Sequence, residues 1–335
     1  MEQVQSKYKI EIIESMHSMP PGTVNEIVLI DEKGIELQDL LTQIEGQSDS
    51  SIVYVVDDVS NAKQAFASAH GMHIVRANAL MSYLEEIHTD IHKQPVLAFW
   101  GVLPQLGTTT IALAVANQLA LSTGMNVGIL GLNLYNPGTS FAHDVTNTLD
   151  DVRPLLSLKQ LTPTKLRESM QLMSQGVWYL PGPRNPLNAM EYQPEEIAYL
   201  ISNAKQAFEL VIVDVGSILN TAAALQSLVM ATLRYVVTKD LLECQERFIS
   251  QSQYILKSLS INTEEILLIG NQMRQPNHLR DYAKTMNVLP VAAIPSFPEL
   301  PYYSENEEDK LRLYFAQKKF KQAIEQIVNA FSNEK

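Results

Sequence analysis

The sequence predicts an α/β protein in which a doubly wound, mostly parallel sheet follows a smaller α/β domain. Short Val- and Ile-rich runs alternate with helical periods along most of the chain, which is the pattern of βαβ units. A polar segment at residues 88–95 interrupts that alternation, and Pro95 cannot continue a helix. We therefore expect a first domain over residues 1–93 and a second domain over residues 94–335.

The expected elements of the first domain are short. Alternating or continuous apolar runs predict strands at residues 9–15, 26–31, 51–58 and 72–77. Apolar residues at helical spacing predict helices at residues 35–45, 60–69 and 78–87.

The second domain begins with a strand at residues 96–101 and a long Ala- and Leu-rich helix at residues 108–124, with Gly124 as its C-cap. An irregular stretch that includes residues 180–186 separates the next strand from the rest. The further strands are expected at residues 126–133, 210–216, 234–239, 264–271 and 290–295, and the further helices at residues 194–207, 241–259 and 317–331.

The composition is that of a globular protein. The chain has 335 residues, of which 46% are hydrophobic and 19% are charged. Its formal net charge of −12 argues against a general affinity for nucleic acid or anionic lipid. A single cysteine, Cys244, excludes an intrachain disulfide and favours a reducing compartment. The start of the chain lacks the features of a signal peptide, and no apolar run approaches the roughly 20 residues of a membrane span. We expect a cytoplasmic protein without a transmembrane segment.

The stretch WGVLPQLGTTT, residues 100–110, joins the first strand of the second domain to its helix. A phosphate-binding loop at such a junction uses glycines, a lysine and a hydroxyl residue that holds magnesium. Gly107, Thr109 and Thr110 match the last glycine and the two hydroxyl residues, whereas Thr108 takes the position of the lysine. Two interpretations remain open: a nucleotide-binding loop, or a strand-to-helix turn with a threonine N-cap.

Five segments, in order, resemble the MinD/ParA family of deviant-Walker P-loop ATPases. The likeness is closest to the CpaE/TadZ branch, which helps to localise and assemble Tad-type pili. The segments lie at residues 96–120, 126–141, 180–217, 266–274 and 291–300. The resemblance covers residues 95–335 and implies a P-loop NTPase fold, a dimer, and ATP or ADP with Mg²⁺ as the ligand.

The resemblance also assigns roles to individual residues. In the family, the loop binds phosphate, the first switch segment follows the next strand, the Walker B aspartate acts on magnesium, and an asparagine and a proline contact adenine. The matching positions here are Gly107, Thr108, Thr109 and Thr110 in the loop, Asn133 in the switch segment, Asp214 as the Walker B residue, and Asn271 and Pro295 at the base.

Four departures remove charged groups that the family uses. Leu103 stands in place of the signature lysine, Thr108 in place of the loop lysine, and Gly131 and Asn133 in place of two aspartates. Phosphoryl transfer depends on positioning and charge stabilisation, so we expect no catalytic residue and negligible hydrolysis. Asp214 has two interpretations, a magnesium partner through water or a polar strand end. Whether nucleotide binds at all stays open.

The first domain resembles an atypical receiver domain, which the CpaE/TadZ branch often carries. Asp31 ends a strand as a phosphoacceptor would, but Glu14 is the only acidic residue at the end of the first strand. Asp57 and Asp58 fall where receivers have Ser or Thr, and Arg76 lies near the place of the usual lysine. We therefore expect a protein-docking module rather than a phosphorylation switch.

Two weaker patterns have simple interpretations. His88 and His92 share a helix face, but no cysteine or third histidine lies near them, so we expect solvated residues and no metal site. The last helix has an apolar stripe that suits packing on the sheet, although MinD binds membrane with a similar helix. The stripe contains Phe320, Ile324, Ile327, Val328 and Phe331.

Three functions are compatible with these observations. The first is a non-hydrolysing scaffold, cytoplasmic or peripheral at the inner face of the membrane, that contacts the proteins of a pilus or secretion machine. The second is an active ATP-dependent dimerisation switch, and the third is a ParA-like DNA-segregation protein, which the negative charge disfavours. For the scaffold we expect a homodimer that the apolar loop residues Val102, Leu103 and Leu106 help to form, unless these side chains fold inward.

Overall fold

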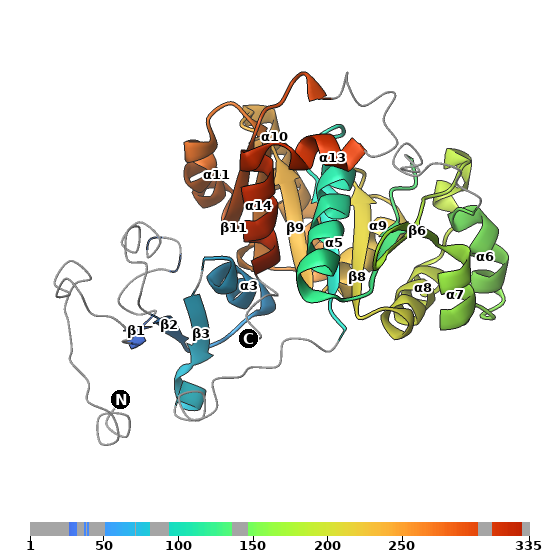
Figure 1. The fold of residues 1–335 in the computed structure, drawn as a ribbon, viewed down its shortest axis with the longest axis horizontal. Coiled ribbons are helices and arrows are strands. Elements are labelled where there is room, and N and C mark those ends of the chain that lie inside the picture. The colour runs from blue at the N-terminus through green and yellow to red at the C-terminus, as the bar shows by residue number, and fades with distance from the viewer. Residues whose placement is uncertain are drawn as a thin grey trace.

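An eight-stranded sheet forms the centre of the protein in a computed structural model, which describes residues 27–31, 37, 39, 51–70, 72–80, 94–135, 147–300 and 310–329 (Figure 1). The strand order is β11-β10-β9-β4-β8-β5-β7-β6. The strands are β4 (Val96–Gly101), β5 (Val127–Gly131), β6 (Gln171–Ser174), β7 (Val177–Leu180), β8 (Leu210–Gly216), β9 (Leu233–Thr238), β10 (Ile266–Met273) and β11 (Leu289–Pro295). Every pair of neighbours is parallel except β6 and β7, so the expected doubly wound, mostly parallel sheet is confirmed.

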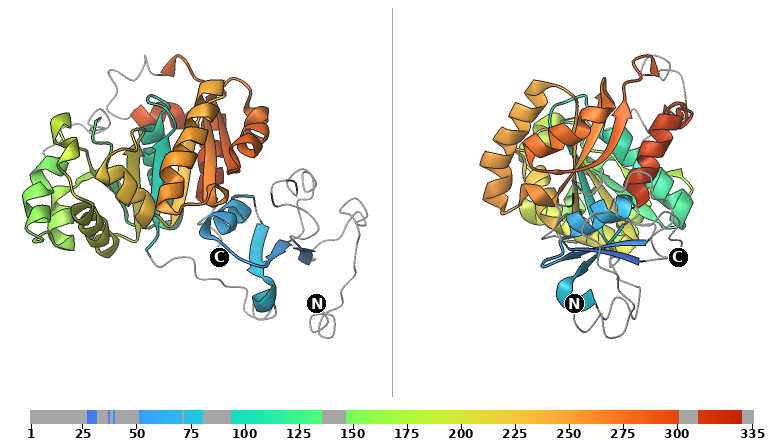
Figure 2. Two further views of the ribbon diagram at one scale, coloured as in Figure 1. Left: turned by 180° about the vertical axis from the view of Figure 1, so that it is seen from behind. Right: turned by 90° about the vertical axis from the view of Figure 1, so that its left-hand side faces the viewer.

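Helices cover both faces of this sheet (Figure 2). The helices α5 (Thr108–Thr123), α13 (Lys310–Phe315) and α14 (Lys318–Val328) lie on one face. The helices α8 (Pro194–Ala207), α9 (Ala222–Met230), α10 (Leu242–Gln251) and α11 (Leu279–Met286) lie on the other face. The chain leaves β4 toward β5 on one side of it, and the later connection from β8 leads to β9 on its other side. The strand order therefore reverses at β4, and doubly wound sheets bind ligands at the carboxyl ends of the strands at such a point.

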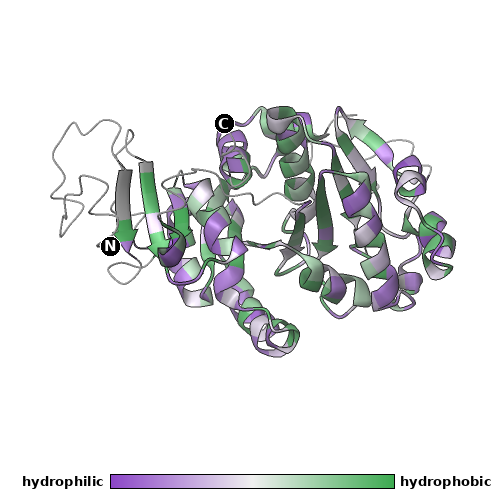
Figure 3. Ribbon diagram, turned by 90° about the horizontal axis from the view of Figure 1, so that it is seen from below, coloured by the Kyte–Doolittle hydropathy of each residue, from purple (hydrophilic) through white to green (hydrophobic). Residues whose placement is uncertain are grey.

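The central strands are apolar on both sides because helices cover both faces. All residues of β4 and β8 are buried, and Figure 3 shows hydrophobic residues concentrated along the sheet. The apolar stripe of α14 packs against β11 and α5, and Phe320, Ile324, Ile327 and Val328 are buried there. The packing interpretation of this stripe therefore holds for its described members; Phe331 lies outside the described residues. None of the described helices combines the length and apolar character that a membrane span requires.

The region expected to be irregular contains regular structure. It holds α6 (Leu149–Ser157), α7 (Pro163–Ser169), the antiparallel pair β6 and β7, and the 3₁₀ turn η4 (Pro186–Met190). Residues 181–185 contain no helix or strand, as expected, but the elements around them were missed because each is short, and α6 also contains Pro154, which weakens its helical signal.

The amino-terminal region forms a separate three-stranded parallel sheet. Its strands are β1 (Ile27–Asp31), β2 (Ser51–Val56) and β3 (Met72–Arg76), in the order β1-β2-β3. The helix α3 (Asn61–Ala69) connects β2 to β3 and also packs against β9, β10, β11 and α14. In Figure 1 it lies below the large sheet, at the ends where β9 and β11 begin. The predicted strand at residues 9–15, the pair His88 and His92, and most of the predicted helices at 35–45 and 78–87 lie outside the described residues.

Candidate functional site at the carboxyl edge of the sheet

The loop between β4 and α5 ends at a glycine whose backbone has a conformation that other residues rarely adopt. Gly107 is the N-cap of α5 with φ 76°, in the left-handed region. A Cβ atom there would also lie 2.6 Å from Nδ2 of Asn271. No side chain caps the helix, so the expected threonine N-cap is wrong and Gly107 takes that position. The first N–H groups of α5 have no intrahelical acceptor, which is the arrangement that favours an anion.

Thr109 and Asp214 form a direct contact beneath this helix start. The Thr109 hydroxyl donates to Oδ2 of Asp214 at 2.5 Å, and the Gly216 N–H donates to Oδ1 at 3.2 Å. The Asp214 side chain is buried, and this burial raises its pKa to about 6 although both hydrogen bonds lower it. P-loop ATPases hold Mg²⁺ with a loop Ser or Thr and a Walker B aspartate, so this pair has the matching chemistry.

Asn271 and Pro295 lie at the same edge, on the neighbouring strands β10 and β11. Asn271 is buried and its Nδ2 donates to the Leu106 carbonyl at 2.7 Å, so the amide supports the loop. Pro295 is the last residue of β11 and is half-buried. The structure thus places both residues that the resemblance assigns to adenine at the carboxyl ends of β10 and β11, and Asn271 of the two contacts the loop.

Asn133 follows β5 and packs against the carboxyl end of β8. Gly216 has φ 76°, and a Cβ atom at this position would lie 2.5 Å from Cγ of Asn133. The neighbouring strands carry these residues together, since Gly131 pairs with Asp214. Asn133 therefore lies beside the Asp214 segment, where the resemblance expects the first switch segment.

The apolar residues of the loop point inward. Val102 is 1% exposed and Leu106 is 5% exposed, and Leu103 packs partly buried against the core. The expectation that this loop offers an apolar dimer contact is therefore wrong for Val102 and Leu106. Thr108 is also buried, and Thr110 is half-buried in the first turn of α5.

Side-chain amides that the sequence did not single out also bond the carbonyl groups of the loop. Gln251 Nε2 donates to the Val102 carbonyl at 3.4 Å, and Gln272 Nε2 donates to the Gln105 carbonyl at 3.2 Å. Lys239 Nζ in turn donates to Oε1 of Gln272 at 3.4 Å. The two contacts with the loop join residues more than a hundred positions apart, and no local pattern marks them.

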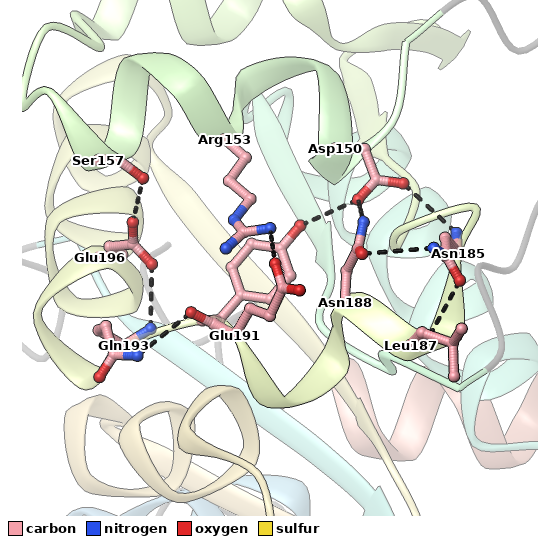
Figure 4. Close-up of polar contacts among 10 residues, drawn as sticks. Asp150, Arg153, Ser157, Asn185, Leu187, Asn188, Glu191, Gln193 and Glu196 are labelled. Atoms are coloured by element: carbon pink, nitrogen blue, oxygen red, sulfur yellow. Dashed lines mark hydrogen bonds and ion pairs between the residues drawn. The ribbon is translucent and has the colours of Figure 1, made fainter.

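A polar network stabilises the segment that follows β7 (Figure 4). Asp150 at the start of α6 accepts from Nδ2 of Asn188 at 3.0 Å and from the Tyr192 hydroxyl at 3.4 Å. Arg153 pairs with Glu191, and the Arg153 guanidinium lies 5.1 Å from the Tyr192 ring centre. The network fixes a turn whose apolar side chains face solvent.

These exposed apolar side chains gather at the carboxyl edge of the sheet. Leu187 and Met190 of η4 are 82% and 66% exposed. Tyr135, in the segment after β5, and Ile218, in the segment after β8, are also exposed. The apolar surface near the candidate site thus comes from these segments and not from the loop after β4.

Chemistry-bearing residues also meet at one edge of the amino-terminal sheet. Asp31 ends β1, Asp57 and Asp58 follow β2, and Arg76 ends β3. Arg76 Nη2 lies 3.1 Å from Oδ1 of Asp58, and both side chains are largely exposed. The basic residue that would meet a phosphate in a receiver is therefore paired with a carboxylate. Glu14 lies outside the described residues.

Comparisons with known proteins identify the fold. Neither protein-family models nor curated protein sequences gave a match. Among solved structures, a ParA family ATPase from Chlorobium tepidum matches with TM-score 0.60 and 18% identity over 70% of this chain and 98% of its own. The septum site-determining protein MinD from Pyrococcus horikoshii, complexed with Mg-ADP, matches with TM-score 0.55 and 18% identity over 70% and 94%. The MinC:MinD complex from Aquifex aeolicus matches with TM-score 0.56 and 15% identity over 72% and 97%. The large sheet of this chain and its helices therefore have the fold of the ParA and MinD ATPases.

Proposed function

We propose that this protein is a non-hydrolysing scaffold of the ParA/MinD fold that localises or assembles a pilus or secretion machine, in the manner of the CpaE/TadZ branch. The observation that carries the proposal is the loop after β4. It keeps the glycine and the threonine of a phosphate loop, but neither of its lysine positions holds a cation. Leu103 packs partly into the core and Thr108 is buried.

The loss of charge extends beyond the loop. Transfer of a phosphoryl group requires cations that stabilise the charge on its oxygens and a group that orients water. Gly131 and Asn133 occupy the positions of two family aspartates, and an amide is neither a base nor an anionic metal ligand. These replacements support a protein that works by binding rather than by turnover.

The same site retains groups that suit a magnesium nucleotide. Thr109 would offer its hydroxyl to the metal, and Asp214 would act on it through water, as in other P-loop proteins. Gly107 and the open N-terminus of α5 would approach the phosphates, and Asn271 and Pro295 would lie at the base. Bound Mg²⁺ would neutralise phosphate charge that no loop lysine neutralises here. We propose ATP or ADP as the ligand class for this residual site.

The scaffold needs surfaces for partners. We propose that residues 1–93 form a protein-docking domain and residues 94–335 the ParA/MinD-like domain. The exposed Leu187, Met190 and Ile218 at the carboxyl edge suit a protein contact, including that of a homodimer. We further propose a cytoplasmic protein, recruited to the inner face of the membrane by its partners.

One observation favours an alternative, an active ATP-dependent dimerisation switch. The contact between Thr109 and Asp214 is intact, and Asp214 is buried at a cost in stability. A buried carboxylate with a raised pKa is typical of a functional site.

A localisation experiment tests the scaffold proposal against this alternative. A fluorescent fusion of the full chain is followed in its host, with and without the genes of the pilus or secretion machine. The scaffold proposal expects foci that depend on the machine and persist in Asp214→Ala and Thr109→Ala variants. Foci that disperse in both variants, while the variants stay folded and abundant, would establish the switch instead.

A further inference from the structure

The helix α3 is buried on more sides than a surface helix of its length requires. A helix that covers one sheet buries a single stripe. In α3, six of the nine residues are buried: Ala62, Ala65, Phe66, Ala67, Ser68 and Ala69. The amino-terminal sheet covers one side, and the starts of β10 and β11 together with α14 cover another. The amino-terminal sheet is thus attached to the large sheet through a shared helix.

His70, the C-cap of α3, makes the polar contacts of this junction. Its Nε2 lies 3.4 Å from the Pro290 carbonyl at the start of β11, and its Nδ1 lies 3.4 Å from Nε2 of Gln326 on α14. Because a carbonyl only accepts and an amide nitrogen only donates, the ring must donate from Nε2 and accept at Nδ1. One neutral tautomer satisfies both partners, and the Phe66 ring packs 4.8 Å away.

Burial of this ring and one nearby charge oppose its protonation. Burial, together with the nearby Arg280, lowers the pKa of His70 to about 4, although the contact with Pro290 raises it. A second link to the large domain is the ion pair between Asp39 and Lys284 of α11, at 2.7 Å. That pair is largely exposed and contributes orientation more than stability.

We propose that α3 and His70 form a rigid joint that holds the amino-terminal sheet at one fixed position on the large domain. The inference rests on the proposed scaffold function and deepens it. A scaffold with such a joint presents its docking domain and its carboxyl-edge surface at a constant separation. The joint lies at the amino ends of β10 and β11, whereas Asn271 and Pro295 lie at their carboxyl ends.

Distance measurements between two spin labels test the joint in the full chain. Cys244 is the only cysteine and is buried, so a Cys244→Ser background allows labels at Asn78→Cys and Ser250→Cys, two exposed positions on either side of the joint. We expect a single narrow distance distribution. His70→Lys, which places a charge between Pro290 and Gln326, should broaden it, and the exposed control His278→Lys should leave it narrow.

A second variant guards against unfolding of the small sheet. Gln326→Arg puts a cation against His70 from the α14 side and leaves the packing of α3 on its own sheet intact. It should broaden the distribution while the amides of β2 and β3 keep their protection from hydrogen exchange. A broad distribution in the parent protein, or a narrow one in both variants, would overturn the proposal. These distance measurements use protein without nucleotide or partners. ATP hydrolysis by this protein would therefore contradict the proposed function without affecting the test of the joint.

Discussion

Two titratable groups, the buried Asp214 and the half-buried His70, lie at opposite edges of the large domain and respond to burial in opposite ways. At the carboxyl edge, burial raises the pKa of Asp214 to about 6, so the side chain is mostly charged at neutral pH in a place that disfavours charge. At the amino edge, burial lowers the pKa of His70 to about 4, so the ring is neutral at neutral pH and both its nitrogens have partners. The carboxyl edge therefore carries a cost in stability and the amino edge does not. Such a cost is typical of functional sites, whereas a satisfied neutral group is typical of structural contacts.

The largest expected effect is the loss of packing at the amino edge. Phe66 of α3 is fully buried, so Phe66→Ala should lower the free energy of unfolding by about 3–5 kcal/mol. Chemical denaturation measures this change. Leu187→Ala removes an exposed apolar side chain at the other edge and should change stability by less than about 0.5 kcal/mol. Equal losses in the two variants would remove the distinction between the edges.

The two titrations should oppose each other between about pH 4 and pH 6.5. The pKa of His70 is lower in the folded state, so its contribution to stability is complete above about pH 6.5 and falls by about 3 kcal/mol toward pH 4. In Asp214→Asn, only the contribution of His70 remains. The variant should therefore lose stability over this range more steeply than the parent, as denaturation at a series of pH values will measure. A variant that follows the parent curve would show that Asp214 does not titrate in this range.

The pKa of Asp214 is higher in the folded state, which reverses the sign. Its folded form binds more protons between about pH 3.8 and pH 6, so stability falls by about 3 kcal/mol as the pH rises through this range and stays reduced above it. Asp214→Asn should therefore be more stable than the parent at pH 7 by an amount of this order. His70→Gln keeps a donor and an acceptor but does not titrate. In this variant the titration of Asp214 should therefore appear alone, as a gain in stability on acidification. A destabilised Asp214→Asn at pH 7 would mean that the carboxylate is structural.

A smaller effect is expected from the amide that holds the loop. Asn271→Ala leaves the Leu106 carbonyl without its buried donor and should cost about 1–2 kcal/mol. The loop after β4 should also exchange its amide hydrogens faster. Asn277→Ala, at an exposed position after β10, is the matched control. If amide exchange in the loop is unchanged in Asn271→Ala, the burial of Val102 and Leu106 alone keeps the loop ordered.

The smallest expected signal is ATP turnover. With Leu103, Thr108, Gly131 and Asn133 in place of charged groups, phosphate release should equal the rate without protein. Asp214→Ala and the parent should then be indistinguishable in this assay. Turnover that Asp214→Ala abolishes would favour the alternative of an active switch.

The long, strongly patterned elements were predictable from the sequence. The strands Val96–Gly101 and Leu210–Gly216 and the helix Pro194–Ala207 have the expected bounds, because continuous apolar runs and a proline at the helix start mark them. The pair β6 and β7 was missed, since strands of four residues are too short for a period to emerge. The position of Gly107 was predictable. Its contact with Asn271 was not, because the two residues are too far apart in the sequence for a local pattern to indicate it.

The inward position of Leu106 was misjudged for a related reason. An apolar residue in a loop is exposed or buried according to what packs beside it, and the contact recorded for Leu106 comes from Asn271 on the distant strand β10. Sequence therefore identified which residues share the carboxyl edge, such as Asp214 and Asn271, but not which of them support the loop.

The loop after β4 has its carbonyl groups bonded by Gln251, Asn271 and Gln272, side chains of the protein itself. A loop supported in this way does not require a phosphate to keep its shape. For a scaffold, this means that assembly would be insensitive to the energy state of the cell. A starved cell and a growing cell would hold the same platform in place, and control of the machine would have to come from the abundance of its parts.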